Sequence, residues 1–172
     1  TVQNQGDTQV QAVVRQSVYA AGSEEPVVTL PEASLTLEPG GKQTAAQEST
    51  VASPKLWTPD TPNLYYVKTE VVVGDAVVDT YTTEFGFRWT NFNTTNGFTL
   101  NGVAMKLKGV CMHHDQGPLG SEAWYRAIER QVEILKEMGV NAIRVTHNPA
   151  APALVEIANR KGMMLIDEAF DT

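Results

Sequence analysis

Through the first half of the chain, hydrophobic and polar positions alternate with a period of two. Residues 10–14 and 34–37 each place apolar side chains on one face of an extended segment. Residues 65–83 contain two such runs on either side of Gly74-Asp75, a dipeptide that favours a tight hairpin turn. No helical period occurs before Asn96. Several short strands at this spacing predict an antiparallel β-sandwich of about 85 to 90 residues.

In the second half, short apolar runs alternate with amphipathic stretches. Apolar residues recur every three or four positions up to Met138, which predicts a helix over 122–138 that Gly139 ends. A second helix is predicted over 152–161, with Pro152 in its first turn. The apolar runs that flank these helices are residues 106–111, 142–145 and 163–166. Short strands alternating with helices predict a parallel α/β architecture.

Each apolar run is followed or interrupted by charged or imidazole side chains. In a parallel sheet the carboxyl ends of the strands open at one edge, so these side chains should converge there. They are His113, His114 and Asp115 with the first run, Arg144, His147 and Asn148 with the second, and Asp167 and Glu168 with the third. The grouping predicts the rim of an active site.

Charge and composition narrow the classes of function. The net charge is −7, and an acidic surface repels phosphate backbones, so we expect no nucleic-acid partner. No apolar run approaches the roughly twenty residues of a membrane span, so we expect a soluble protein with no membrane partner. The residues leave the compartment open, whether the cytoplasm of a bacterium, its periplasm or the exterior. The single cysteine, Cys111, ends a predicted buried strand, which favours a small core residue over a nucleophile.

The change of pattern places a domain boundary near Phe85-Gly-Phe-Arg88. We expect residues 1–88 to form the sandwich and residues 89–172 to form the α/β part. The first residues, Thr1-Val-Gln-Asn, are neither a signal peptide nor a natural start. We therefore expect a piece of a longer protein.

Six segments, in this order, resemble glycoside hydrolase family 2, the β-galactosidase and β-glucuronidase group. They are residues 54–65, 85–88 (Phe-Gly-Phe-Arg), 98–102, 107–110 with His113, 141–149 (Asn-Ala-Ile-Arg-Val-Thr-His-Asn-Pro) and 167–170 (Asp-Glu-Ala-Phe). The resemblance implies an immunoglobulin-like β-sandwich followed by the first three β-strands and two helices of a catalytic (β/α)8 TIM barrel. It also implies a retaining exo-acting enzyme, of β-galactosidase type, that takes a carbohydrate substrate.

By the same resemblance, the acid/base and nucleophilic glutamates of the family belong to later barrel strands. A complete barrel takes about 250 residues, whereas 76 residues follow Asn96. Asp167 and Glu168 are adjacent on one strand and point to opposite faces, so they cannot flank a sugar as a catalytic pair. We expect no catalytic residue in this chain and no glycosidase activity from the chain alone.

What the resemblance carries over is a set of supporting residues. Arg144 matches an arginine that holds the nucleophilic carboxylate, and His147 and His113 match histidines that contact sugar hydroxyls. Glu168 matches a position that braces the arginine or a histidine. The Asp115 carboxylate could bind sugar hydroxyls or cap the following loop, and the Asn148 amide could serve the sugar or the turn. His114 stands where the family often has an acidic residue.

Two other functions stay open for the residues present. His113, His114, Asp115 and His147 are ligand types for a metal-dependent barrel hydrolase, although their spacing is not that of a common metal motif. A non-catalytic structural or carbohydrate-binding sandwich module is the other. We assign no cofactor and no metal ligand in this chain; a divalent or monovalent ion in the full-length enzyme stays open, as do the sugar and linkage.

An open set of barrel strands has further consequences. Three parallel strands leave two unpaired edges, which predicts self-association through the exposed barrel edges. Side chains meant for a closed barrel interior, namely Leu107, Ile143 and Leu165 or their alternating neighbours, should face water.

Overall fold

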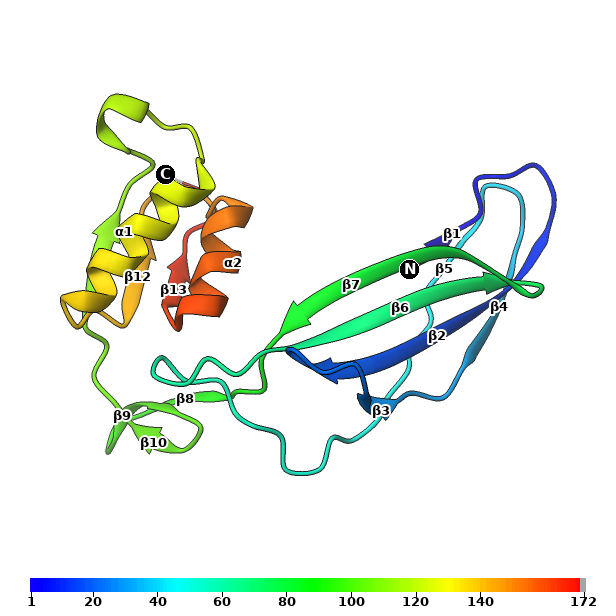
Figure 1. Cartoon of the computed structure of the whole chain (residues 1–172), viewed down its shortest axis with the longest axis horizontal. Coiled ribbons are helices and arrows are strands. Elements are labelled where there is room, and N and C mark those ends of the chain that lie inside the picture. The colour runs from blue at the N-terminus through cyan, green and yellow to red at the C-terminus, as the bar shows by residue number, and fades with distance from the viewer. Residues whose placement is uncertain (171–172) are drawn as a thin grey trace. The chain divides into compact units, whose positions relative to one another are not determined.

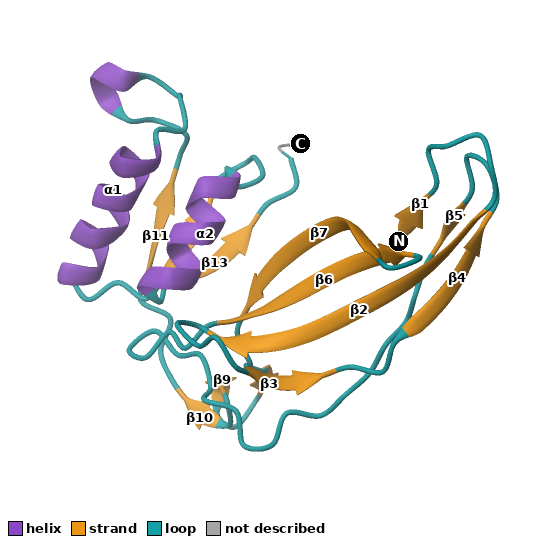
Figure 2. Ribbon diagram, turned by 45° about the vertical axis from the view of Figure 1, so that its right-hand side comes forward, coloured by secondary structure: helices purple, strands orange, loops and turns teal. Residues whose placement is uncertain are grey.

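The structure, a computed structural model, describes residues 1–170 and divides into two compact units. The first unit comprises residues 1–54 and Tyr65–Phe85, and the second comprises Lys55–Leu64 and Gly86–Thr172. Figures 1 and 2 show the strands of the first unit and the helix-bearing second unit. None of the helices in residues 1–170 has the length and apolarity that a membrane crossing requires.

The first unit is an antiparallel β-sandwich, as predicted. Its larger layer has the strand order β3-β2-β6-β7, and β4 also pairs with β2. Those strands are β2 (Val10–Ala20), β3 (Pro26–Thr29), β4 (Ala33–Leu37), β6 (Tyr65–Val73) and β7 (Ala76–Phe85). The smaller layer pairs β1 (Val2–Gln3) with β5 (Lys42–Gln43). The predicted hairpin is confirmed, because β6 pairs with β7 around Gly74, whose φ of +59° suits glycine.

The core of the sandwich follows the two-residue period. Ala12 and Val14 of β2 and Leu35 and Leu37 of β4 are buried together, on alternate positions of their strands. Val2 from the smaller layer packs against them. The face that the sequence pattern marks as apolar is therefore the face that lies between the layers.

The second unit contains an antiparallel meander and a parallel α/β segment. The meander has the order β10-β9-β8, and the parallel sheet has the order β11-β12-β13. The strands are β8 (Thr90–Asn93), β9 (Gly97–Leu100), β10 (Val103–Ala104), β11 (Gly109–Met112), β12 (Ala142–Val145) and β13 (Met164–Asp167). The helices are η1 (Gly117–Leu119), α1 (Tyr125–Glu137) and α2 (Pro152–Lys161). This β-α-β-α-β order is the beginning of the predicted barrel.

The helices cover one face of the parallel sheet. Ile128 and Val132 of α1 and Ile157 of α2 are buried against Ile143 and Val145 of β12. Burying a side chain of this size contributes about 1.5 to 3 kcal/mol. The apolar spacing that predicted the helices therefore identifies the residues that join them to the sheet.

The first helix begins later than predicted. The spacing predicts a start at Glu122, whereas α1 begins at Tyr125, and Trp124 is the N-cap residue with an extended backbone and no capping side chain. Trp124, the first residue of the predicted apolar stripe, is 57% exposed. The backbone N–H of Trp124 donates to the carbonyl oxygen of Glu122, so these residues form a turn ahead of the helix. The second helix has its predicted bounds.

Residues 55–64 lie in the second unit, although they connect β5 and β6 of the sandwich. Trp57 is 2% exposed and packs with Leu100, Ala142 and Met164. Its indole N–H donates to the carbonyl oxygen of Asn159 at 2.8 Å. This segment is therefore part of the hydrophobic core beneath the barrel strands.

Candidate functional site

The face of the parallel sheet opposite the helices carries the side chains that the helices leave uncovered. Cys111, Arg144 and Ile166 occupy the same level of β11, β12 and β13 in the strand register, and all three are exposed. Their alternating neighbour Ile143 is buried against the helices. Of the two alternating sets that the sequence left open, the structure exposes the one with Arg144 and Ile166, because the helix layer buries Ile143 and packs against Leu165.

Cys111 is on this open face, so the expectation of a buried core residue is wrong. The physical reason is the two-residue period, since its neighbours Val110 and Met112 turn to the helices instead. The guanidinium of Arg144 points one N–H at the sulfur, with Nη1 and Sγ 3.7 Å apart. The thiol is a neighbour of the candidate site.

Glu168 joins two of the strand ends. Its Oε1 accepts a hydrogen bond from Nε of Arg144 at 2.6 Å, and its Oε2 accepts one from the backbone N–H of His147 at 2.6 Å. Arg144 lies on β12 and Glu168 follows β13, so a neighbouring strand end holds the arginine from one side. Both contacts that the sequence left open for Glu168, with Arg144 and with a histidine, are present.

His147 has a left-handed backbone, with φ of +72°. This region is unfavourable for a residue with a Cβ atom, and the cost is about 1 to 3 kcal/mol. The Glu168 carboxylate stabilises it by accepting the His147 N–H. With this backbone, the imidazole rings of His147 and His113 lie 5.5 Å apart between their centroids, and their planes are tilted by 59°. Three strand ends therefore meet at His113, Arg144, His147 and Glu168.

Hydrogen bonds within this group shift the pKa values of Glu168 and Arg144 in opposite directions. The N–H of His147, and after it the Arg144 guanidinium, lower the pKa of the Glu168 carboxyl. The hydrogen bond with Glu168, and after it the contact with Cys111, raise the pKa of Arg144. Glu168 is thus held as a carboxylate and Arg144 as a cation, and the guanidinium extends along the open face to Cys111.

The other predicted residues lie around this group. The Asp115 carboxylate caps its own loop, because Oδ1 accepts the backbone N–H of Gly117 at 2.8 Å. His113, His114 and Asp115 line a small pocket of about 50 Å³ together with Ala151 at the start of α2. Asn148 is exposed in the loop after β12.

Sequence reasoning missed the role of Asp167. Its Oδ1 accepts the backbone N–H of Ala150 at 2.9 Å. Asp167 and Glu168 therefore fix two points of the loop that carries His147. The signal was their adjacency at a strand end, since neighbours on a strand point to opposite sides and can each reach a separate part of one loop.

Within residues 1–170, no group of three or more histidine, cysteine, aspartate or glutamate side chains is arranged to hold a metal ion. The aromatic contact between His113 and His147 brings two of the four candidate ligands together. The Asp115 carboxylate is used by its own loop.

Two family models match the chain. Residues 1–88 match "Glycosyl hydrolases family 2", and residues 93–171 match "Glycosyl hydrolases family 2, TIM barrel domain". A relative, the β-galactosidase BoGH2A of Bacteroides ovatus, is 44% identical over 171 residues, which is 99% of this chain and 20% of the relative.

Solved structures show the same likeness. The β-glucuronidase of Bacteroides uniformis superposes with a TM-score of 0.90 at 30% identity, over 98% of this chain and 20% of that one. A family 2 glycosyl hydrolase from Bacteroides cellulosilyticus gives a TM-score of 0.87 at 38% identity, over 95% of this chain and 22% of that one. The chain spans about a fifth of the length of the relatives that it matches.

Proposed function

The chain belongs to glycosyl hydrolase family 2, and from this premise we propose that the whole protein is a retaining β-glycosidase of the β-galactosidase type. It removes terminal β-linked sugars from carbohydrates. The relative named a β-galactosidase, with 44% identity over 99% of the chain, supports this sugar. The structural likeness to a β-glucuronidase makes a glucuronide the alternative substrate.

Within this reaction the described residues position groups and do not break the bond. A retaining mechanism needs two carboxyl groups about 5 to 5.5 Å apart, one as acid/base and the other as nucleophile. Both oxygens of Glu168 are already engaged, by Arg144 and by the His147 backbone. We assign both catalytic glutamates to parts of the protein outside these residues.

The observation that carries the proposal is the way Arg144 is held. Glu168 binds its Nε, and its Nη1 contacts Cys111 Sγ, so the guanidinium lies along the open face of the strands. A guanidinium presents its donors in a plane and matches a carboxylate at two points. We assign to Arg144 the orientation of the nucleophilic carboxylate, and to Glu168 the orientation of Arg144.

The two histidines suit contact with sugar hydroxyls. A neutral imidazole can donate one hydrogen bond and accept another. The side chain of His147 is 43% exposed, and His113 is exposed beside it. We assign both to the sugar, with Asn148 and His114 at the rim and Asp115 shaping the loop between β11 and α1.

For the chain on its own we also propose association through the barrel strands. In the described residues, β11 and β13 each pair on one side only. Leu107 and Ile166 are 38% and 53% exposed, so apolar surface accompanies these open edges. The whole protein would cover this surface with its own later strands.

In the whole enzyme, Arg144→Lys should lower kcat by about tenfold or more and leave the melting temperature nearly unchanged. An ammonium cannot keep one contact with Glu168 and offer a planar pair of donors to a second carboxylate. Steady-state hydrolysis of nitrophenyl β-galactoside measures the effect. Arg126→Lys is the matched control, because Arg126 is likewise an arginine paired with carboxylates, but it lies on the exposed face of α1. Equal kcat in the two variants would refute the role of Arg144.

A second prediction follows from the pKa of Glu168, which lies below that of a free glutamate. The carboxylate contacts stabilise the loop above the ordinary pKa of about 4.3, and this contribution is lost as the pH falls through the lower folded value. NMR titration of the Glu168 side-chain carboxyl should give a pKa below 4.3, and the amide signal of His147 should shift with it. A Glu168 pKa at or above the ordinary value would contradict the two hydrogen bonds that the Glu168 carboxylate accepts from Arg144 and the His147 backbone.

A further inference from the structure

The last strand of the sandwich has an open edge. β7 pairs with β6 along its whole length, from Ala76 to Phe85, and it ends the sheet order among the residues that the structure describes. An edge strand presents a row of backbone N–H and C=O groups to which another strand can bind. At ten residues, β7 is longer than the average strand of about five to six.

This edge lacks proline and basic side chains, two of the features that commonly prevent pairing. β7 contains no proline, lysine or arginine, and its charged residues are Asp79 and Glu84. The apolar side chains on it are uncovered: Val77 is 51% exposed, Val78 58% and Tyr81 70%. The one irregularity against β6 lies near the hairpin turn, between Val71 and Val72, so the stretch from Asp79 onward is regular.

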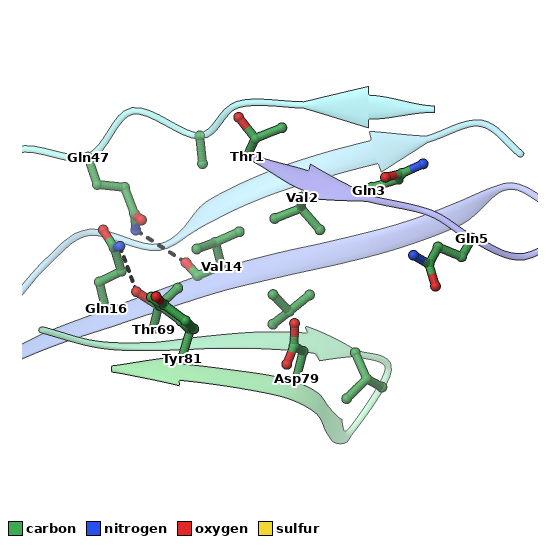
Figure 3. A pocket seen from close by; sticks show the side chains of 13 residues that line it. Thr1, Val2, Gln3, Gln5, Val14, Gln16, Gln47, Thr69, Asp79 and Tyr81 are labelled. Carbon is green, nitrogen blue, oxygen red and sulfur yellow. Dashed lines mark hydrogen bonds between the residues drawn. The ribbon is translucent and has the colours of Figure 1, made fainter. Parts of the chain in front are cut away.

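The smaller layer of the sandwich does not extend over β7. A groove of about 820 Å³ lies between the two, lined by Thr1 and Val2 on one side and by Val78, Asp79 and Tyr81 of β7 on the other. Figure 3 shows Asp79 pointing from its strand into this space. Strand β2 has Val2 packed against its buried face, whereas β7 has both its outer edge and this face open.

We propose that this edge binds a second copy of the chain, through antiparallel pairing of β7 with β7 about a two-fold axis at Tyr81. A closed two-fold contact presents one surface to itself, so a strand forms it only when its own sequence is complementary in the antiparallel direction. The pairing extends the sheet of one copy into that of the other and covers Tyr81.

The side-chain pairs across the axis favour one register. With the axis at Tyr81, Thr80 lies opposite Thr82 and Asp79 lies opposite Thr83, and the two Tyr81 rings face each other. Hydroxyl pairs and aromatic pairs across strands are favourable, and like charges directly opposite are unfavourable. An axis at Asp79 would oppose two carboxylates, and a register that pairs Asp79 with Glu84 would do the same. The register centred on Tyr81 avoids both.

Sedimentation of the 172-residue chain tests the surface. The wild-type chain should form dimers, and Tyr81→Lys should weaken dimer formation by about tenfold or more, because it places two ammonium groups at the axis. Phe92→Lys is the matched control, since Phe92 is an equally exposed aromatic residue (71%) on a strand of the other unit. It should sediment as the wild type does. A monomeric wild type, or a Tyr81→Lys chain that forms dimers as strongly as the Phe92→Lys chain does, would overturn the proposal.

Disulfide trapping tests the register separately from association through the barrel strands. In a Cys111→Ser background, which removes the only cysteine, Tyr81→Cys should form a cross-linked dimer under mild oxidation. Residues directly opposite on antiparallel strands have Cα atoms about 4.5 to 5.5 Å apart, within the range of a disulfide. Asp79→Cys should not cross-link, because its own copy lies four residues away along the ladder. Cross-linking at 79 and not at 81 would overturn the register.

Discussion

The 172-residue chain, purified alone, is expected to hydrolyse nitrophenyl β-galactoside and nitrophenyl β-glucuronide no faster than buffer does. The rate acceleration by a retaining enzyme depends on two facing carboxyl groups. Because the two groups act together, almost all of this acceleration is lost when both are absent. The carboxylates at the strand ends are used otherwise, since Glu168 holds Arg144 and the His147 backbone, and Asp167 holds Ala150. Release of nitrophenol over hours measures the result.

The whole protein is the positive control, and Glu168→Gln is the decisive variant. Turnover by the chain that survives further purification and is lost in Glu168→Gln would show that this carboxylate is catalytic. Turnover that Glu168→Gln leaves intact would place the chemistry elsewhere in the chain. Either result would refute the assignment of both glutamates to other parts of the protein.

The convergence of the candidate site could be predicted because the order of strands and helices fixes the direction of the strands. Three apolar runs separated by helices give parallel strands, and parallel strands bring their ends to one edge. Arg144, His147 and Glu168 follow from that rule alone, and the structure brings them together. The left-handed backbone of His147 could not be predicted, because no glycine marks it and a carboxylate 21 residues away stabilises it.

Errors in the sequence analysis arose where a local pattern has two solutions. An apolar residue every three or four positions indicates a helix, but it does not say whether the first of them, Trp124, is inside the helix or ahead of it. A strand with apolar residues on both sides leaves open which set faces the helices, and the structure turns Cys111 outward and buries Ile143. Tertiary packing decides both cases.

Local sequence patterns cannot predict that residues 55–64 belong to the second unit. The turn residues between Leu56 and Leu64 predict a loop, and the chain order assigns it to the sandwich. Contacts across about a hundred residues assign it to the second unit instead, above all the hydrogen bond from Trp57 to Asn159. Two glycines show how closely this segment packs against the rest of the second unit. A Cβ atom at Gly86 would lie 2.8 Å from that of Trp57, and one at Gly162 would overlap the carbonyl oxygen of Pro59.

Trp57→Ala is therefore expected to destabilise the second unit by about 3 to 5 kcal/mol, the usual cost of removing a large buried aromatic side chain. The substitution leaves a cavity against Leu100, Ala142 and Met164 and removes the bond to Asn159 at the end of α2. Urea unfolding followed by circular dichroism at the helical band reports on this unit, because both α-helices of the described residues belong to it.

Two further tryptophan variants separate the causes. Trp57→Phe retains most of the ring but loses the indole N–H, so it should cost more than the hydrogen bond alone, which contributes about 1 kcal/mol, and less than Trp57→Ala. Trp124→Ala removes the same side chain from a position that is 57% exposed, and a surface change of this kind costs about 0.5 kcal/mol or less. If Trp57→Ala and Trp124→Ala unfolded at the same urea concentration, the segment 55–64 would not anchor the barrel strands.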